Sequence, residues 1–181
     1  MKLTNHFLYM ANYNRRMNQQ ILTLAENLST DELSENKGAF FQSIIGTLNH
    51  ILVGDIVWLT RFNLHSSHYD SLKEVLALAK PQGLADILYA DLTAYRQARE
   101  TVDAALINWL SHDIDEGDFN RNLVYSNTKG VRSSRNFGEL VSHLFNHQTH
   151  HRGQVSTLFN QMGLDIGVTD YLVDIPDYQG V

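Results

Sequence analysis

The chain contains long stretches in which apolar side chains recur every three or four residues and no proline interrupts them. Its two prolines, Pro81 and Pro176, lie outside these stretches. This spacing predicts amphipathic helices, and scarce proline lets helices run long. Four helices of this length predict an all-α four-helix bundle, a single domain over residues 1–181. The four stretches are residues 4–28, 41–62, 84–110 and 136–162.

Shorter signals mark the connections between these helices. The run from Ser29 to Glu32 is typical of a helix stop followed by the first turn of a short helix. Residues 122–126 and 130–132 are candidates for a small β-hairpin before the last helix. Gly163 follows the last helix and suits the left-handed conformation that ends many helices. The stretch 41–62 is apolar over most of its circumference, which predicts a central position.

Composition and charge restrict the class of partner. The chain has no cysteine, which excludes a disulfide scaffold, an iron–sulfur cluster and a cysteine nucleophile. Its 14 basic and 20 acidic residues give a net charge of −6, which argues against nucleic-acid binding. No apolar run approaches the roughly 20 residues that cross a bilayer, and the first residues lack the apolar core of a secretory signal. We therefore expect a cytoplasmic protein whose partners include neither nucleic acid nor membrane.

Histidine is the unusual residue, because the chain has nine and four of them fall between residues 143 and 151. At about 100° per residue, His147 and His151 lie on or beside the apolar stripe of the last helix, whereas His143 and His150 lie toward its rim. Imidazoles four residues apart are neighbours on one helix face and can hold one divalent ion. The alternative is a pair of interior histidines with other hydrogen-bond partners, which both rings need when buried.

A metal held by this pair needs a third ligand from another helix. His50 is the candidate, because the stretch 41–62 contains no other histidine. It lies off the main apolar face of that helix, on a side with Gly46, Val53 and Gly54 that a different neighbour would bury. Gly54, one turn later, leaves open space beside His50. Periodicity alone leaves both a ligand role and another role open for His50.

Three motifs together resemble the DinB/YfiT-like family. They are the opening run from Tyr9 to Asn18, the stretch from Leu48 to Phe62 with His50, Asp55 and Trp58, and the string His-Gln-Thr-His-His-Arg-Gly-Gln from His147 to Gln154. The resemblance covers nearly the whole chain. The sequence departs from the family pattern at residues 16–18, where a tryptophan that is common in the family is replaced. The resemblance implies an antiparallel four-helix bundle, often a homodimer, in which His50, His147 and His151 bind one divalent metal.

Three neutral imidazoles leave a divalent ion with its full charge and an open position. Zn²⁺ or Ni²⁺ is the ion we expect, since imidazole suits both. Water or a thiol bound there would be the nucleophile. Relatives in the family include bacillithiol and mycothiol S-transferases. The resemblance therefore implies that a low-molecular-weight thiol, as a cosubstrate, is transferred to a small-molecule substrate.

Two other functions stay open at this point. A metal-dependent hydrolase would use hydroxide, although the chain lacks the glutamate that the His-Glu-x-x-His helix places between its paired histidines. A non-catalytic stress protein would bind the metal or a small molecule without turnover. Thiol-dependent turnover would separate the S-transferase from both.

Four further residues are candidates for orienting a ligand or contacting a substrate. Gln154 lies beside His147 on the helix, and is either an orienting group or a rim amide. Arg152 lies at the opposite edge of the stripe, where it contacts an anionic substrate or forms an ordinary ion pair. Trp58 and Tyr13 are expected to wall the pocket or to belong to the core.

The remaining polar residues receive structural interpretations. Asp55 is expected to pair with a residue such as Arg61, or to hydrogen-bond a histidine. Gly153 destabilises a helix by about 1 kcal/mol relative to alanine, which predicts a close helix–helix approach. The other histidines are expected to be solvated: His6, His65, His68 and His112.

Overall fold

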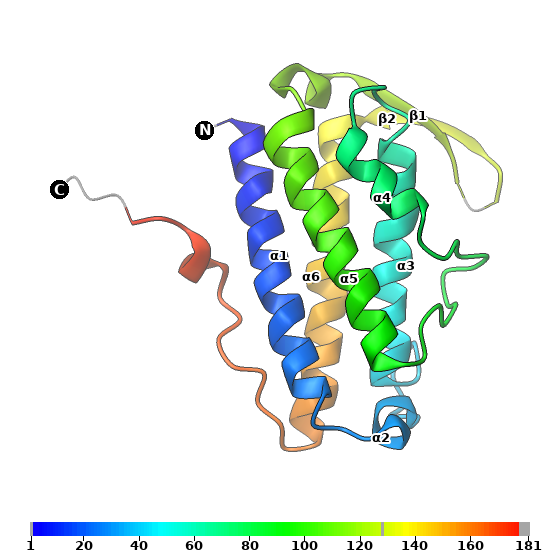
Figure 1. Cartoon of the computed structure of the whole chain (residues 1–181), viewed down its shortest axis with the longest axis vertical. Coiled ribbons are helices and arrows are strands. Elements are labelled where there is room, and N and C mark those ends of the chain that lie inside the picture. Colours follow the sequence, from blue (N-terminus) through cyan, green and yellow to red (C-terminus); the bar gives the residue numbers. More distant parts are fainter. Residues whose placement is uncertain (1, 128, 178–181) are drawn as a thin grey trace.

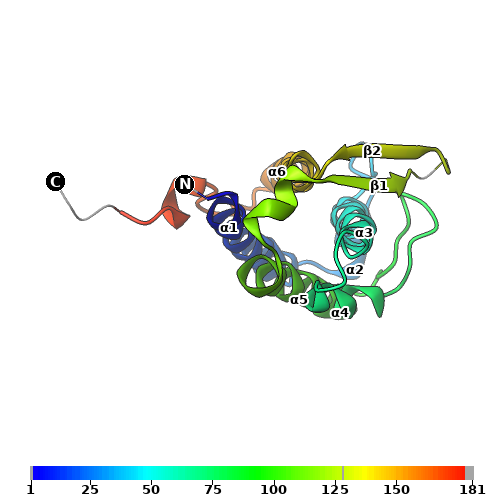
Figure 2. The same ribbon diagram turned by 90° about the horizontal axis from the view of Figure 1, so that it is seen from above.

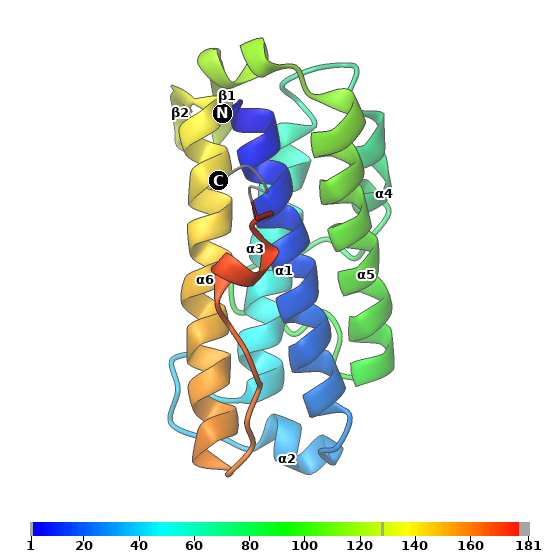
Figure 3. The ribbon, with the colours of Figure 1, turned by 90° about the vertical axis from the view of Figure 1, so that its left-hand side faces the viewer.

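Four long helices pack side by side along most of the molecule (Figure 1). They are α1 (Leu3–Ala25), α3 (Ile44–Phe62), α5 (Leu92–Asn108) and α6 (Phe137–Gln161), in a computed structural model that describes residues 2–127 and 129–177. α1 and α6 run in one direction and α3 and α5 in the other, as the colours in Figures 1 and 3 show. The prediction of an all-α four-helix bundle is therefore confirmed.

Short elements lie between these helices and after α6. They are α2 (Thr30–Ser34), α4 (Lys73–Leu76) and the single turns η1 (Asp70–Leu72), η2 (Trp109–Asp113), η3 (Glu116–Asn120) and η4 (Tyr171–Asp174). Ser29 begins α2 as predicted, because its hydroxyl accepts the backbone N–H of Glu32 while the Glu32 carboxylate accepts the N–H of Ser29 at 2.7 Å. Gly163 follows α6 with φ +75°, as predicted.

The predicted hairpin is present beside α6 and α3 (Figure 2), but its second strand starts later than expected. β1 (Asn122–Ser126) pairs antiparallel with β2 (Arg132–Asn136). Gly130, expected in the strand, belongs to the turn because its φ is +76° and its N–H donates to the carbonyl of Asn127 at 2.9 Å.

The helix predicted over residues 84–110 is wrong at its start, because α5 begins only at Leu92. The carboxylate of Asp91 accepts a backbone N–H of the first turn at 2.8 Å and caps the helix there. Leu84 and Ile87, which extend the apolar pattern, lie in a connecting loop and are 47% and 50% exposed. The loop is long because α3 and α5 run in the same direction, so the chain must return along the bundle between them.

The central position predicted for the helix now labelled α3 is confirmed. Every residue from 44 to 56 is buried, on all sides of the helix. α6 and α5 cover two sides of α3. The loop before α5 contacts a third side of α3 through a hydrogen bond to His50. Within the described ranges, no helix combines the length and the apolar character that crossing a membrane requires.

A buried ionic layer crosses the centre of the bundle. Arg99 on α5 lies between the carboxylates of Asp55 on α3 and Asp103 on α5, and all three side chains are at most 3% exposed. Gln148 on α6 donates to Asp55 at 2.8 Å. Burial alone would lower the pKa of Arg99, but the two carboxylates outweigh it and raise that pKa. The predicted pairing of Asp55 with Arg61 is wrong, because Arg99 occupies that carboxylate.

The segment after α6 lies against α1, as Figure 3 shows. Arg16 forms an ion pair with Asp174 at 2.6 Å, and the Tyr13 hydroxyl donates to the backbone carbonyl of Thr169 at 3.0 Å. These contacts lie on the side of α1 that faces the C-terminal segment. They draw Tyr13 away from the face of the bundle on which the histidines gather.

Candidate metal centre

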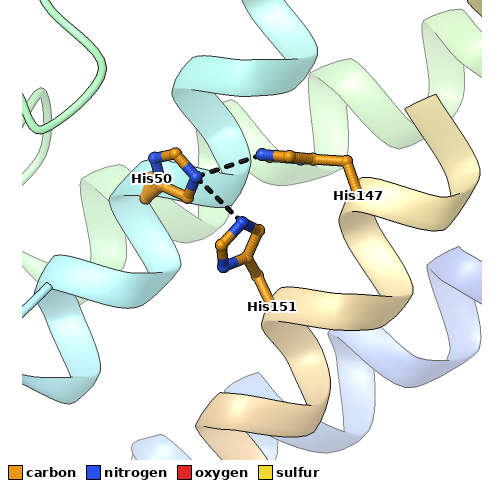
Figure 4. A group of neighbouring side chains, drawn as sticks. All are labelled: His50, His147 and His151. Carbon is orange, nitrogen blue, oxygen red and sulfur yellow. Dashed lines mark hydrogen bonds between the residues drawn. The ribbon is translucent and has the colours of Figure 1, made fainter. Parts of the chain in front are cut away.

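His50 on α3 and the pair His147 and His151 on α6 meet in space (Figure 4). Nε2 of His50 lies 3.0 Å from Nε2 of His147 and 3.1 Å from Nε2 of His151. His50 is buried, and His147 and His151 are half-buried. The structure thus brings together the three residues predicted as ligands, and their binding of a metal stays a prediction.

The outer nitrogens of two rings fix which atoms point inward. Nδ1 of His50 lies 2.7 Å from the carbonyl oxygen of Leu84 and therefore carries the proton. Nδ1 of His151 lies 2.8 Å from the amide oxygen of Gln154, whose amide nitrogen faces His150 Nε2 at 3.2 Å. Both inward Nε2 atoms are therefore unprotonated. Two lone pairs facing each other at 3.1 Å repel, and a cation between them removes that repulsion.

The electrostatics keep all three rings in the metal-binding form. Burial, together with the nearby His151 and His50, lowers the pKa of His147 to about 3. Burial also lowers the pKa values of His50 and His151. Metals bind the neutral imidazole, so the site is ready at neutral pH. Nitrogen ligands of a tetrahedral ion lie roughly 3.3 Å apart, close to the observed separations. The donor set therefore fits a divalent metal.

Two glycines of α3 make this approach of rings possible. A Cβ atom at Gly54 would lie 2.6 Å from Cε1 of His147, so the imidazole occupies the space that glycine leaves open. A Cβ atom at Gly46 would lie 2.2 Å from the carbonyl oxygen of Phe41. This close turn lets the Phe41 ring stack on the His50 ring, with centroids 3.7 Å apart and planes 16° apart.

Sequence reasoning missed Phe41 and Leu84 as parts of the site. Phe41 covers one face of His50, and Leu84 acts only through its backbone carbonyl. Neither carries a side chain with metal chemistry. Both lie in loops, where the sequence instead predicted the first residues of the helices 41–62 and 84–110. The start predicted for the first of these helices is therefore wrong too, because α3 begins at Ile44. The turn at Gln42, with φ +67°, is the local feature that positions Phe41.

The four candidate supporting residues divide into two groups. Gln154 contacts His151 as an orienting group would, and Trp58 lies one step further out, against His143 at a centroid distance of 5.2 Å. Arg152 is buried on the opposite side of α6, where it contacts Asn14 and lies over the Tyr13 ring at 5.3 Å. The structure therefore places Arg152 and Tyr13 among the contacts of α1, and neither touches the histidines.

Two other sequence interpretations are wrong. His65 is not solvated, because its ring stacks on Phe137 with centroids 3.9 Å apart and its Nε2 lies 3.2 Å from the carbonyl oxygen of Asp118. Gly153 does not mark a close helix approach, since it is exposed and a Cβ there would meet nothing within 4 Å. Nothing in the structure explains a glycine at that position.

A helical bundle with a buried cluster of three histidines that could hold a metal defines the class of this protein. The chain belongs to the DinB family, whose profile matches residues 1–178. It is similar to Protein DinB of Bacillus subtilis (strain 168), with 25% identity over 162 residues that cover 88% of this chain and 87% of that protein. The family assignment confirms the resemblance that the sequence motifs indicated.

Proposed function

We propose that this protein is a metal-dependent thiol S-transferase whose ion is held by His50, His147 and His151. One observation supports this above all: three neutral imidazoles converge, and no negatively charged ligand joins them in the described part of the chain. A divalent ion in such a site would retain its full charge and favour the deprotonated form of a thiol. Because the chain has no cysteine, the thiol is a separate small molecule.

The contacts of the triad favour thiol transfer over hydrolysis. The outer nitrogens of His50 and His151 face a backbone carbonyl and an amide, and not a carboxylate. Asp55, five residues along α3 from His50, is held by Arg99 and Gln148. Among the described residues, the cluster that could hold a metal contains no carboxylate of the kind that metal hydrolases use as a general base. A thiol of suitable acidity needs no such base once its charge is stabilised.

In the proposed reaction, a sulfur–carbon bond forms and the bond between that carbon and its leaving group breaks. The leaving group takes the electron pair, and the thiol proton passes to solvent at the half-exposed edge of the site. Leu84 and Gln154 hold their imidazoles with Nε2 inward, and the Phe41 ring shields His50 from water. These residues keep the three imidazoles in place while the thiol and the electrophile bind, react and leave.

Metal content is the first test. Untagged protein, purified without a nickel column, is analysed by mass spectrometry for zinc, nickel and other divalent metals. We expect close to one ion per chain in the native protein, and loss of that ion in His147→Ala and His151→Ala. His143→Ala is the matched control, since His143 is on the same helix but exposed. A native protein that holds no metal and takes up none at micromolar concentration contradicts the proposal.

Turnover is the second test. The metal-loaded protein is offered glutathione or cysteine together with a chloronitroaryl electrophile, and separately a nitrophenyl ester without thiol. We expect thiol-dependent product that is lost in His147→Ala and kept in His143→Ala. Ester hydrolysis without thiol would instead assign the protein as a hydrolase. A metal-loaded protein that turns over neither substrate class would be a binding protein.

A further inference from the structure

A pocket of about 400 Å³ lies between α3 and the segment that includes α4 and the loop after it. Its volume falls in the range of small-molecule sites. Two cationic side chains, Arg61 and Lys80, line it, and no acidic side chain among the described residues does, although the chain has a net charge of −6. The other walls are largely apolar, formed by Ile56, Val75, Leu76 and Pro81.

Arg61 is held in place by aromatic rings and not by an acid. Its guanidinium lies 4.8 Å from the centroid of the Trp58 ring and 5.1 Å from that of the Tyr125 ring. Within the described ranges it forms no ion pair and no side-chain hydrogen bond. Burial lowers the pKa of Arg61, because the charge has lost part of its water. Cation–π contacts offset part of that loss, but all five N–H donors are left for a ligand.

We propose that this pocket binds an amphipathic carboxylate. The guanidinium of Arg61 presents a planar pair of donors that suits both oxygens of a carboxylate, and Lys80 adds a second positive charge at the pocket rim. The apolar walls take the rest of the ligand. Because Trp58 and Tyr125 restrain the guanidinium, little side-chain entropy is lost when the anion binds.

The position of the pocket connects it to the histidines. Arg61 and His50 are eleven residues apart on α3, which brings them back to nearly the same side of the helix, about 16 Å apart along its axis. Gly54 and Val57 lie between them on that side. Resting on the proposed function, we assign the carboxylate to one end of an elongated substrate whose other end reaches the triad.

Calorimetric titration of the full chain tests the pocket with three probes: octanoate, its uncharged analogue octanamide, and acetate. We expect octanoate to bind at least about tenfold more tightly than either of the others, the ratio for a charge-assisted hydrogen bond. Arg61→Gln should remove that preference, and Lys80→Gln, at an exposed position, should reduce it. Arg15→Gln, at an exposed arginine of α1, is the control and should bind octanoate as the native chain does.

Equal binding of octanoate and octanamide, or unchanged octanoate binding in Arg61→Gln with its native circular dichroism, overturns the proposal. In that case the role of Arg61 is structural: its contact with Tyr125 holds the β-hairpin against α3. His147→Ala should still bind octanoate, because none of the residues that line the pocket is a ligand of the metal. This variant therefore tests the pocket separately from the metal site. If thiol transfer is found, Arg61→Gln should raise KM for a carboxylate-bearing substrate and leave KM for an uncharged one unchanged. If no transfer is found but octanoate binding depends on Arg61, the pocket stands and the S-transferase assignment fails.

Discussion

The His147 imidazole fills the volume that a side chain at residue 54 would need, because a Cβ atom at Gly54 would lie 2.6 Å from His147 Cε1. A ligand on α6 thus depends on a missing side chain on α3. The two helices come close enough here for His50 and His147 to bring their Nε2 atoms within 3.0 Å. Gly54 is therefore part of the site, although it has no donor atom.

Gly54→Ala should weaken metal binding by about 10–100-fold, the range found when a group that orients a metal ligand is changed. The added methyl group displaces the His147 ring from the other two imidazoles. Competition with a chromogenic chelator measures the affinity. Native affinity in a folded Gly54→Ala protein would show that the ring has room to move.

Gly153→Ala is the matched control for that substitution, on the opposing helix. A Cβ atom at Gly153 meets nothing within 4 Å, so alanine should raise the free energy of unfolding by about 1 kcal/mol through helix propensity alone. Metal affinity should not change. Urea denaturation measures the stability of Gly153→Ala, and chelator competition measures its metal affinity.

Gln154→Leu should lower metal affinity by about 10–100-fold, because Nδ1 of His151 loses the amide oxygen at 2.8 Å that fixes its tautomer. Gln161→Leu, at an exposed glutamine of the same helix, should leave the affinity unchanged. The same chelator competition compares the two variants. An equal effect of both would mean that Gln154 acts on the helix and not on the imidazole.

Asp55→Ala should lower the free energy of unfolding by about 3–5 kcal/mol, because it leaves the Arg99 guanidinium buried without this partner. Equilibrium urea denaturation measures the loss. Glu100→Ala serves as control, since Glu100 pairs with Arg96 at 3.6 Å on the exposed side of α5 and alanine suits a helix. No measurable loss is expected there.

His65 should make the free energy of unfolding depend on pH. Burial lowers the pKa of folded His65, and this effect outweighs the hydrogen bond to the Asp118 carbonyl, which raises that pKa. The unfolded chain therefore binds the proton first as pH falls below about 6.5, so this part of the stability is present above that pH and lost below it. His65→Phe keeps the stack on Phe137 and removes the titration. Denaturation of both proteins from pH 7.5 to 5 should show a shallower slope for the variant, and parallel slopes would contradict the prediction.

The helices and the α6 half of the site were predictable because their signals are local. Apolar spacing within one segment reports which face is buried, and His147 and His151 lie together on any helix that includes both. Gln154 follows from the same arithmetic, since it is one turn after His150 and beside His151. The error at residues 84–91 has the same origin: an apolar pattern resembles a helix even where Asp91 caps one and the residues before it form a loop.

The sequence by itself therefore determined the bundle, its long helices and a histidine pair able to share an ion. Only the tertiary structure decided that His50 joins that pair, because its side of α3 is buried by α6 and by the loop at Leu84, and periodicity within one helix carries no information about the neighbour it meets. Periodicity likewise could not predict that Asp55 pairs with Arg99 instead of Arg61, or that Arg61 lines a pocket without an acidic side chain among the described residues. Contacts between distant segments depend on how the helices are arranged, and that arrangement is set by the packing of the whole core.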